Sequence, residues 1–399
     1  MTDLLQFIRQ QQSAYQERGW RLPIWLAGSE LYTQQQLSAL EPEAVSYWLG
    51  QQAPAGFTLL SAKQKQQWLG TECDVLVVDA RHAVDWDLVA ASSGCLKAGG
   101  LWLFVTNEPD LWQQQPNPAA KRVLPYPLDA AVYSGLFKQF WLEQLSEQRW
   151  VKLIEGNSAV IPLLPEVMVS PQAEQPYRTA EQQQAVAAIH KVVTGHRRRP
   201  LVLTAHRGRG KSSALGLAAA QLAQQGKTDI LLTGPSPVAV QTAFFIAADL
   251  LSLSYQPGQN QLLNGAIRFV PVDALLAEKQ QNTVILVDEA AAIPTPQLQQ
   301  LTDLYSRLVF ATTEHGYEGT GRGFQLRFQS YLQQHCPGFQ KLHLHQPIRY
   351  QANDPLEQLI FKGFLLEQTD SAITEIQQPR LTSYPIKDLL LQPQKLQQI

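Results

Sequence analysis

An apolar run that breaks into a glycine-rich turn constrains the fold of this 399-residue chain more than any other feature. Residues 201–213 have the sequence Leu-Val-Leu-Thr-Ala-His-Arg-Gly-Arg-Gly-Lys-Ser-Ser. A strand, a glycine turn and a helix in this order let consecutive backbone N–H groups surround a phosphate at the helix N-terminus. The strict motif has a glycine where this chain has Ala205, but the lysine and the hydroxyl that follow are present. The segment predicts a nucleoside triphosphate site.

Two carboxylates at the end of another apolar run complete this prediction. Residues 284–289 have the sequence Val-Ile-Leu-Val-Asp-Glu, the pattern of a buried parallel strand. In enzymes that hydrolyse ATP or GTP, a lysine contacts the β- and γ-phosphates, a hydroxyl and an aspartate hold Mg²⁺, and another residue orients the attacking water. We assign these roles to Lys211, Ser212, Asp288 and Glu289, in that order. The alternative is a strand–turn–helix that packs without a ligand, and the presence of both halves disfavours it.

Composition narrows the class of protein. The net charge is −2 and the sequence pI is near 6.5, so any surface for nucleic acid must be a local basic patch. The three cysteines, at positions 73, 95 and 336, show no disulfide or metal-ligand spacing, and we expect them to be reduced and buried. The N-terminus has no secretory pattern, and no apolar run reaches the roughly 18 residues of a membrane span. We therefore expect a soluble cytoplasmic protein with no membrane attachment.

Strand and helix patterns alternate along the chain and predict two α/β domains. Residues 1–161 contain strand patterns at 22–27, 73–79 and 100–105, which indicates an N-terminal α/β domain with a parallel sheet. Four prolines within residues 162–176 block a regular helix and predict an interdomain linker.

The second domain, residues 177–369, is expected to be a RecA-like P-loop NTPase domain with a parallel sheet. Residues 370–399 are expected to be a C-terminal tail, and truncation of a longer protein is one explanation for it. Within the second domain, we expect helices at 180–194, 211–225, 237–252 and 296–305, and strands at 201–204, 229–233, 267–271, 283–288 and 307–311.

Four polar segments each have two interpretations. The sequence Thr-Ala-Glu-Gln at 179–182 is either a capping box or a glutamine that binds the adenine edge, and the two are equally favoured. Asp79 stands where α/β sheets bind ligands, but a cap on the following helix is favoured. Residues 233–236 contact a nucleic-acid backbone or cap the next helix, and the cap is again favoured. The basic residues 196–199 are more typical of a solvated loop than of an RNA contact.

Two further segments follow the predicted strands of the second domain. Residues 316–324, Gly-Tyr-Glu-Gly-Thr-Gly-Arg-Gly-Phe, come directly after the strand expected at 307–311, which indicates a coupling loop with Arg322 near phosphate. Arg349 follows Pro347 and Ile348. An arginine directed at the γ-phosphate would stabilise transition-state charge, whereas a plain surface arginine is the alternative.

Four of these segments together resemble the tRNA(Met) cytidine acetyltransferase family. They are residues 204–212, 287–294, 316–324 and 346–349, and the N-terminal region up to residue 100 is also similar to that family's amino-terminal domain. The resemblance implies an ATP-driven, RNA-helicase-like module. Such a module would help to present the wobble cytidine of elongator tRNA(Met) for N4-acetylation from acetyl-CoA, either with or without a separate acetyltransferase chain.

The resemblance also assigns residues. It implies that Asp288 and Glu289 support hydrolysis. Together with the motif chemistry above, the assignment is Ser212 and Asp288 for Mg²⁺, and Lys211, Asp288, Glu289 and Arg349 for catalysis. The residues after Arg349 are too few for an acyltransferase fold, so we expect this chain by itself not to transfer acetyl groups. The positions implied for the ATP site are Gln182, Gly208, Arg209, Gly210, Lys211, Ser212, Ser213, Ala214, Leu215, Gly216, Leu217 and Arg349.

Two other functions stay open from the sequence. One is a nucleotide-gated adaptor that binds tRNA without turnover. Glu289 argues against it, because a clamp does not need a carboxylate that orients water. The other is a complete acetyltransferase, which would require a glycine-rich acetyl-CoA loop that we do not find after Arg349.

Overall fold

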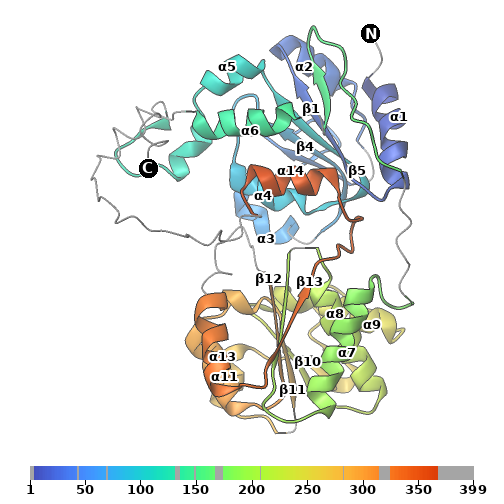
Figure 1. Cartoon of the computed structure of the whole chain (residues 1–399), viewed down its shortest axis with the longest axis vertical. Helices are drawn as coiled ribbons and strands as arrows, with labels where there is room; N and C mark the ends of the chain where they lie inside the picture. The colour runs from blue at the N-terminus through green and yellow to red at the C-terminus, as the bar shows by residue number, and fades with distance from the viewer. Residues whose placement is uncertain are drawn as a thin grey trace. The chain divides into compact units, whose positions relative to one another are not determined.

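The computed structural model shows two compact units, each built on its own sheet (Figure 1). The first unit comprises the described residues of Met1–Met168 and of Tyr350–Ile399, and the second those of Val169–Arg349. Within the part of the chain that the structure describes, no helix combines the length and apolar character needed to cross a bilayer. The described residues are 4–42, 45–68, 71–130, 135–147, 150–166, 174–206, 208–281, 283–313 and 324–366.

The first unit contains a six-stranded sheet in the order β3-β2-β4-β5-β1-β6, and every pairing in it is parallel. All six residues of β1 are buried, as expected of a strand that is covered on both faces. The strands are β1 (Leu22–Ala27), β2 (Ser46–Leu49), β3 (Thr58–Leu59), β4 (Cys73–Asp79), β5 (Leu96–Thr106) and β6 (Val151–Ile154). The helices include α1 (Leu4–Glu17), α2 (Glu30–Ser38), α3 (Lys65–Trp68), α4 (Trp86–Ser93), α5 (Pro109–Gln114), α6 (Leu136–Ser146) and α14 (Pro355–Gly363), with short 3-10 turns η1 (Ala62–Gln64) and η2 (Pro118–Arg122).

The second unit contains a seven-stranded sheet in the order β13-β7-β12-β11-β8-β10-β9. All its pairings are parallel except that of the edge strand β9 with β10. The strands are β7 (Leu201–Ala205), β8 (Ile230–Thr233), β9 (Gln261–Leu262), β10 (Ile267–Phe269), β11 (Val284–Val287), β12 (Leu308–Thr313) and β13 (Gln340–Leu344). The helices include α7 (Ala180–Thr194), α8 (Lys211–Gln224), α9 (Gln241–Leu250), α10 (Val272–Ala277), α11 (Thr295–Leu304) and α13 (Gln329–His335), with short turns η4 (Pro237–Val240), η5 (Leu263–Gly265), η6 (Ala290–Ala292) and η7 (Phe324–Phe328).

The predicted fold class, two α/β regions with parallel sheets, is confirmed. The three cysteines are free and buried, as expected. The helix expected at 237–252 differs: the chain first makes the turn η4 and only then enters α9 at Gln241. Pro237 lies in the first turn of η4, where its missing N–H costs no helical hydrogen bond.

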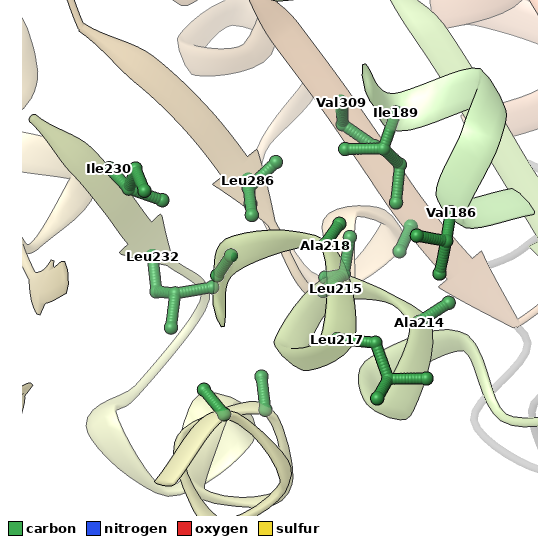
Figure 2. Close-up of a cluster of buried hydrophobic side chains, with 14 of the residues drawn as sticks. Val186, Ile189, Ala214, Leu215, Leu217, Ala218, Ile230, Leu232, Leu286 and Val309 are labelled. Atoms are coloured by element: carbon green, nitrogen blue, oxygen red, sulfur yellow. The ribbon is translucent and has the colours of Figure 1, made fainter. Parts of the chain in front are cut away.

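One face of the second sheet packs against α7, α8 and α9 (Figure 2). Gly216 lies at the closest approach of α8 and α9, because a Cβ at this residue would stand 2.4 Å from the carbonyl oxygen of Ala243. Only a glycine permits this separation of the two helices without a shift. The buried hydrophobic side chains between this sheet face and the helices include Val186, Ile189, Ala214, Leu215, Leu217, Ala218, Ile230, Leu232, Leu286 and Val309.

The helix α14 belongs to the first unit although it follows the second unit in sequence. It packs against α4, α6 and β1 and buries Leu356, Leu359 and Ile360. Phe364, just beyond the helix, meets the Trp141 ring edge-on with 5.2 Å between ring centroids. This differs from the expected second domain of residues 177–369, because the apolar face of α14 is buried in the first unit. The other division falls inside the expected linker, and the expected tail, 370–399, lies outside the described residues.

Candidate nucleotide-binding site

The phosphate loop, of which the structure describes residues 206 and 208–210, connects β7 to α8 at the carboxyl edge of the second sheet. Gly208 and Gly210 have φ values of +77° and +82°, a left-handed conformation that favours glycine. A Cβ at residue 210 would also lie 2.9 Å from Nε2 of Gln182 and 3.2 Å from two carbons of Ile348. Ala205, where the strict motif has glycine, is the last residue of β7 and is fully buried in the core. A methyl group fits there, which explains this departure from the motif.

The acidic pair follows β11, at the same edge of the sheet. The N–H of Asp288 donates to the Thr233 carbonyl at the end of β8, at 2.8 Å. Asp288 is fully buried, and its Oδ1 accepts the N–H of Glu289 at 2.9 Å. Its Oδ2 is buried without a hydrogen-bond partner among the described residues. A buried carboxylate oxygen left in this state is suited to a cation or to a donor brought by a ligand.

The lysine and the serine that begin α8 lie near the carboxyl of Asp288. Burial, followed by the charge of Glu289, raises the pKa of Asp288 to about 7. The Ser212 hydroxyl and the Lys211 ammonium act on the same pKa in the opposite direction, so both groups lie near the carboxyl. Lys211 is the first residue of α8 and is itself buried, with Nζ 3.5 Å from the carbonyl oxygen of His206.

Glu289 has an unusual backbone conformation. Its φ of +47° and ψ of 45° are left-handed, which costs an L-residue with a side chain roughly 1–2 kcal/mol. The turn η6 begins directly after it, and the N–H of Ala291 donates to the Thr312 hydroxyl at 3.2 Å. Backbone strain of this kind is common at functional sites, where the surrounding structure holds it in place.

Gln182 lies beside the phosphate loop, and its two candidate roles are separated between backbone and side chain. Its N–H donates to the Thr179 hydroxyl at 3.1 Å, which caps α7. Its side chain is buried, with Oε1 accepting the N–H of Arg178 at 2.8 Å and Nε2 facing Gly210. The cap therefore leaves the carboxamide next to the loop rather than folded back onto Thr179.

Residues 345–348 are fixed against this site by contacts that the sequence did not reveal. The N–H of Ile348 donates to the carbonyl oxygen of Gly208 at 3.0 Å. Glu181, in the first turn of α7, accepts the N–H groups of His345 and Gln346 at 2.6 and 2.8 Å. These bonds join segments more than 130 residues apart, so no local pattern could have indicated them. Arg349, half-buried, is the next residue after this fixed segment.

A group of histidines lies at the same edge and was also missed. The Thr204 hydroxyl and Nδ1 of His343 are 2.9 Å apart. The ring of His343 lies 5.8 Å from that of His206 and 4.3 Å from that of His345, measured between centroids. These rings pack beside the loop. Among the described residues, no three side chains of His, Cys, Asp or Glu are placed to hold a metal ion.

Several residues that the resemblance assigned to the ATP site have another environment. The side chains of Ala214, Leu215 and Leu217 belong to the hydrophobic core, and Gly216 lies against α9. Core packing accounts for the side chains at 214, 215 and 217, and the close approach to α9 accounts for the glycine at 216. Arg209 and Ser213, in contrast, flank the start of α8 and are buried at the loop itself.

The remaining polar segments of the second unit lie at different places. Residues 196–199 are exposed and precede β7, so they lie at the sheet edge opposite the phosphate loop. Ser236 occupies the N-cap position of η4, but its side chain makes no capping bond. The expected coupling loop, including Arg322, falls outside the described residues up to Phe324.

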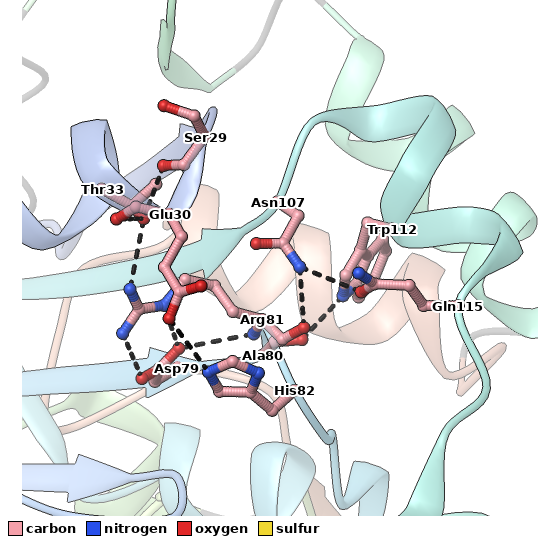
Figure 3. A network of polar contacts seen from close by, with 10 residues as sticks. All are labelled: Ser29, Glu30, Thr33, Asp79, Ala80, Arg81, His82, Asn107, Trp112 and Gln115. Carbon is pink, nitrogen blue, oxygen red and sulfur yellow. Dashed lines mark hydrogen bonds and ion pairs between the residues drawn. The ribbon is translucent and has the colours of Figure 1, made fainter.

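A polar cluster also lies at the carboxyl edge of the first sheet (Figure 3). Asp79 binds Arg81 through two bonds of 2.8 Å, and Arg81 also donates to the Thr33 hydroxyl at 3.2 Å. Asn107 donates to the Arg81 carbonyl at 2.9 Å. The favoured prediction that Asp79 caps the next helix is wrong. Asp85 caps α4 instead, with Oδ1 accepting the N–H of Leu88 at 3.3 Å.

Two family models match the chain. The N-terminal domain of tRNA(Met) cytidine acetyltransferase TmcA matches residues 1–156, and the helicase domain of RNA cytidine acetyltransferase NAT10/TcmA matches residues 202–367. The tRNA(Met) cytidine acetyltransferase TmcA of Vibrio cholerae is 38% identical to this chain, and the aligned region covers 100% of this chain and 54% of that relative. The protein of the same name from Nitrosococcus halophilus is 39% identical over 84% of this chain and 46% of its own length.

The chain spans about half the length of the curated relatives it matches. A solved structure, the large terminase of a thermophilic bacteriophage, covers 43% of this chain and 46% of its own length, with a TM-score of 0.30 and 15% identity. That likeness is too slight to inform either fold or function.

Proposed function

Because this chain belongs to the tRNA(Met) cytidine acetyltransferase family, we propose that its second unit binds ATP with Mg²⁺ and hydrolyses it in an RNA-helicase-like module. The N–H groups of the phosphate loop and Lys211 bind the β- and γ-phosphates. Ser212 and Asp288 hold the metal ion. When bound, Mg²⁺ neutralises charge that develops on the phosphate oxygens.

Three further residues complete the proposed reaction. Glu289 accepts a hydrogen bond from the attacking water and orients it. Arg349 stabilises the charge of the transferred phosphoryl group. The Gln182 carboxamide, beside Gly210, binds the adenine edge, since an amide can donate to and accept from adenine at once.

The observation that supports the proposal most directly is the environment of Asp288. A fully buried carboxyl with one oxygen lacking a partner among the described residues lies near the serine and the lysine that begin α8. Burying an unsatisfied ionisable group costs free energy, so a role in ligand binding accounts for it better than packing does. The donor set, one hydroxyl and one carboxylate, suits Mg²⁺, which prefers oxygen ligands.

We further propose that this ATPase supports N4-acetylation of the wobble cytidine of elongator tRNA(Met). The curated relatives are named tRNA(Met) cytidine acetyltransferases, and both matched family models are named for cytidine acetyltransferases. Neither matched model describes the acetyl-transferring domain itself. We propose ATP turnover and tRNA presentation as the contribution of residues 1–399 to that reaction.

ATP turnover with and without tRNA tests the proposal. The purified chain should release phosphate from ATP, and Lys211→Ala should reduce turnover by roughly 10²-fold or more, because a charge contact to the reacting phosphate is lost. Lys227→Ala is the matched control, since Lys227 is exposed beyond the end of α8, and it should retain full turnover. Equal turnover in both variants, or none in the unmodified chain with any RNA, would exclude the ATPase.

The adaptor without turnover is the second candidate, and Glu289 separates the two. For an ATPase, Glu289→Gln should abolish phosphate release while ATP still binds, because the amide keeps the shape of the side chain but loses its charge. An adaptor would show ATP-dependent tRNA affinity and no phosphate release in the unmodified chain. In that case Glu289→Gln would leave tRNA binding unchanged.

A further inference from the structure

The second unit has a basic turn at the amino edge of its sheet, the edge opposite the phosphate loop. Residues 196–199, His-Arg-Arg-Arg, lie between the end of α7 and the start of β7, and all four are exposed. We call Arg197, Arg198 and Arg199 the arginine patch. The five residues of β7 separate it from the phosphate loop by roughly 17 Å. The patch therefore contributes nothing to the proposed ATP site.

Backbone bonds fix this turn to two other segments of the same unit. The N–H of Arg198 donates to the Ser306 carbonyl at 3.0 Å, just before β12. The N–H of Gln340, the first residue of β13, donates to the Pro200 carbonyl at 2.9 Å. Arg198 has a φ of +58°, which is strained for a residue with a side chain. A loop without such bonds would relax out of this conformation, whereas here the patch is held in one arrangement.

A fourth guanidinium lies beside the patch. Nη1 of Arg307, which is half-buried, donates to the carbonyl oxygens of Val192 and Gly195 at the end of α7. Burial, followed by the charge of Arg197, lowers the pKa of Arg307. Two guanidinium groups that act on each other repel, and a bound anion relieves that repulsion. Arg307 already satisfies carbonyl groups at the end of α7, so the exposed arginines are not needed as a helix cap.

No acidic side chain pairs with the arginine patch among the described residues. Burial raises the pKa of the Cys336 thiol, and the charges of Arg198 and Asp303 act on it in opposite directions. Asp303 is therefore near the patch, but it accepts the Tyr331 hydroxyl at 2.6 Å and forms no ion pair with Arg198. The net charge of the chain is −2, so a basic composition does not explain the patch.

We propose that the arginine patch binds the phosphate backbone of a structured RNA, at a surface separate from the ATP site. This inference rests on the proposed presentation of tRNA and not on ATP turnover. The planar guanidinium matches a phosphate group through two parallel hydrogen bonds, which an ammonium group does not offer. The relatives of this chain are named for a reaction on tRNA, so RNA is favoured over an acidic protein as the polyanion.

The surroundings of the patch favour phosphates over bases. Recognition of unpaired bases relies on exposed aromatic rings on which the bases stack. The exposed large hydrophobic side chains of the described residues include none at positions 190–200 or 303–340. We therefore expect binding that is independent of base sequence and that weakens steeply as the salt concentration rises.

Replacing the three arginines by glutamine in the full chain tests this. The variant carries Arg197→Gln, Arg198→Gln and Arg199→Gln, and fluorescence anisotropy without nucleotide measures its affinity for labelled elongator tRNA(Met). We expect the affinity to fall at least about 10-fold at about 0.1 M salt. The slope of log Kd against log salt concentration should decrease by about 2–3, because three phosphate contacts are lost. ATP turnover without RNA should be unchanged, since the patch is remote from the phosphate loop.

A second triple variant with Lys63→Gln, Lys65→Gln and Lys121→Gln is the matched control. It removes the same total charge from lysines of the first unit that form no ion pair among the described residues. Its affinity for tRNA should stay within about 2-fold of the unmodified chain, because salt screens charges outside the contact. Equal losses in the two triple variants would overturn the inference, as would an unchanged affinity in the arginine variant. Competition by polyglutamate as strong as that by RNA would assign the patch to acidic proteins instead.

Two outcomes separate this inference from the proposed function. If the unmodified chain binds no tRNA, the proposed presentation of tRNA fails. If it binds tRNA equally well without the patch, only this inference is wrong. Should the triple arginine variant not fold, Arg197→Gln with Arg199→Gln keeps the strained residue 198 and gives the same test, with an expected decrease in slope of about 1–2.

Discussion

At the scale of single residues, Asp288 combines burial, an acceptor oxygen without a partner among the described residues, and a pKa raised to about 7. Burial is the largest cause of the raised pKa, and the neighbouring Glu289 charge adds to it. In the unfolded chain the carboxyl would titrate near 4. Between these pH values the folded chain retains a proton that the unfolded chain releases, so this group makes the fold less stable as the pH rises from about 4 to 7.

The same shift predicts proton release on nucleotide binding. A metal ion requires the charged carboxylate, so binding of Mg·ATP should release the Asp288 proton at pH 6. At pH 8 the carboxyl is already ionised, and binding should release no proton from it. Calorimetry in two buffers of different ionisation enthalpy measures this release. We expect close to one additional proton at pH 6 relative to the Asp288→Asn chain, in which ATP titrates but residue 288 does not. Equal release from both chains at pH 6 would contradict the assignment.

At the scale of elements, the contact between α8 and α9 positions the phosphate loop, because Lys211 is the first residue of α8. Gly216→Ala would place a methyl carbon 2.4 Å from the carbonyl oxygen of Ala243, so the helices would have to move apart. We expect the free energy of unfolding to fall by about 1–3 kcal/mol, as overpacking does elsewhere. Urea denaturation followed by circular dichroism measures it. Gln224→Ala, at the exposed end of α8, should change stability by less than about 0.5 kcal/mol.

The sequence predicted those elements whose signals are local. The helix at 180–194 has the predicted ends because Thr179 caps one end and Gly195 follows the other. The strand at 73–79 was recognisable from its continuous apolar run. β13 was missed, since Gln-Lys-Leu-His-Leu has no strong strand pattern and is held by its pairing with β7, more than 130 residues earlier.

The candidate site also has parts that the sequence predicted and parts that it did not. The phosphate loop and the acidic strand are contiguous motifs, so their types and spacing were visible in the sequence. The bonds of Glu181 and Ile348 to distant backbone groups were not, because they depend on how β7 and β13 pair. The resemblance also extends the ATP site to residue 217, which stays a prediction; the structure adds that the side chains of Ala214, Leu215 and Leu217 pack in the core, which a local motif does not indicate.

At the scale of the whole molecule, the first unit is completed by a segment that follows the second. The Arg21–Asp354 pair joins the two sequence segments of that unit. Arg21→Met would leave a buried carboxylate without its partner, which costs about 3–5 kcal/mol of stability. Arg9→Met, which removes an exposed pair with Glu41, should cost less than about 0.5 kcal/mol.

Tryptophan fluorescence during urea denaturation measures the stability of the first unit alone in both variants, because all nine tryptophans precede residue 151. Adding Asp354→Asn to the Arg21→Met chain should recover part of the lost stability, since the unpaired charge is removed. A loss from Arg21→Met no larger than that from Arg9→Met would show that the pair does not hold residues 350–363 in the first unit.

Residues 350–363 also determine where the chain can be divided into fragments. Because α14 completes the first unit, the second unit is, in sequence terms, an insertion with two boundaries, one within residues 162–176 and one at 349–350. A fragment that stops at the proline-rich segment would lack the partner of Arg21 and the last helix of its own core. Exchange of the second unit between relatives would therefore need two crossover points, with residues 350–363 retained by the recipient.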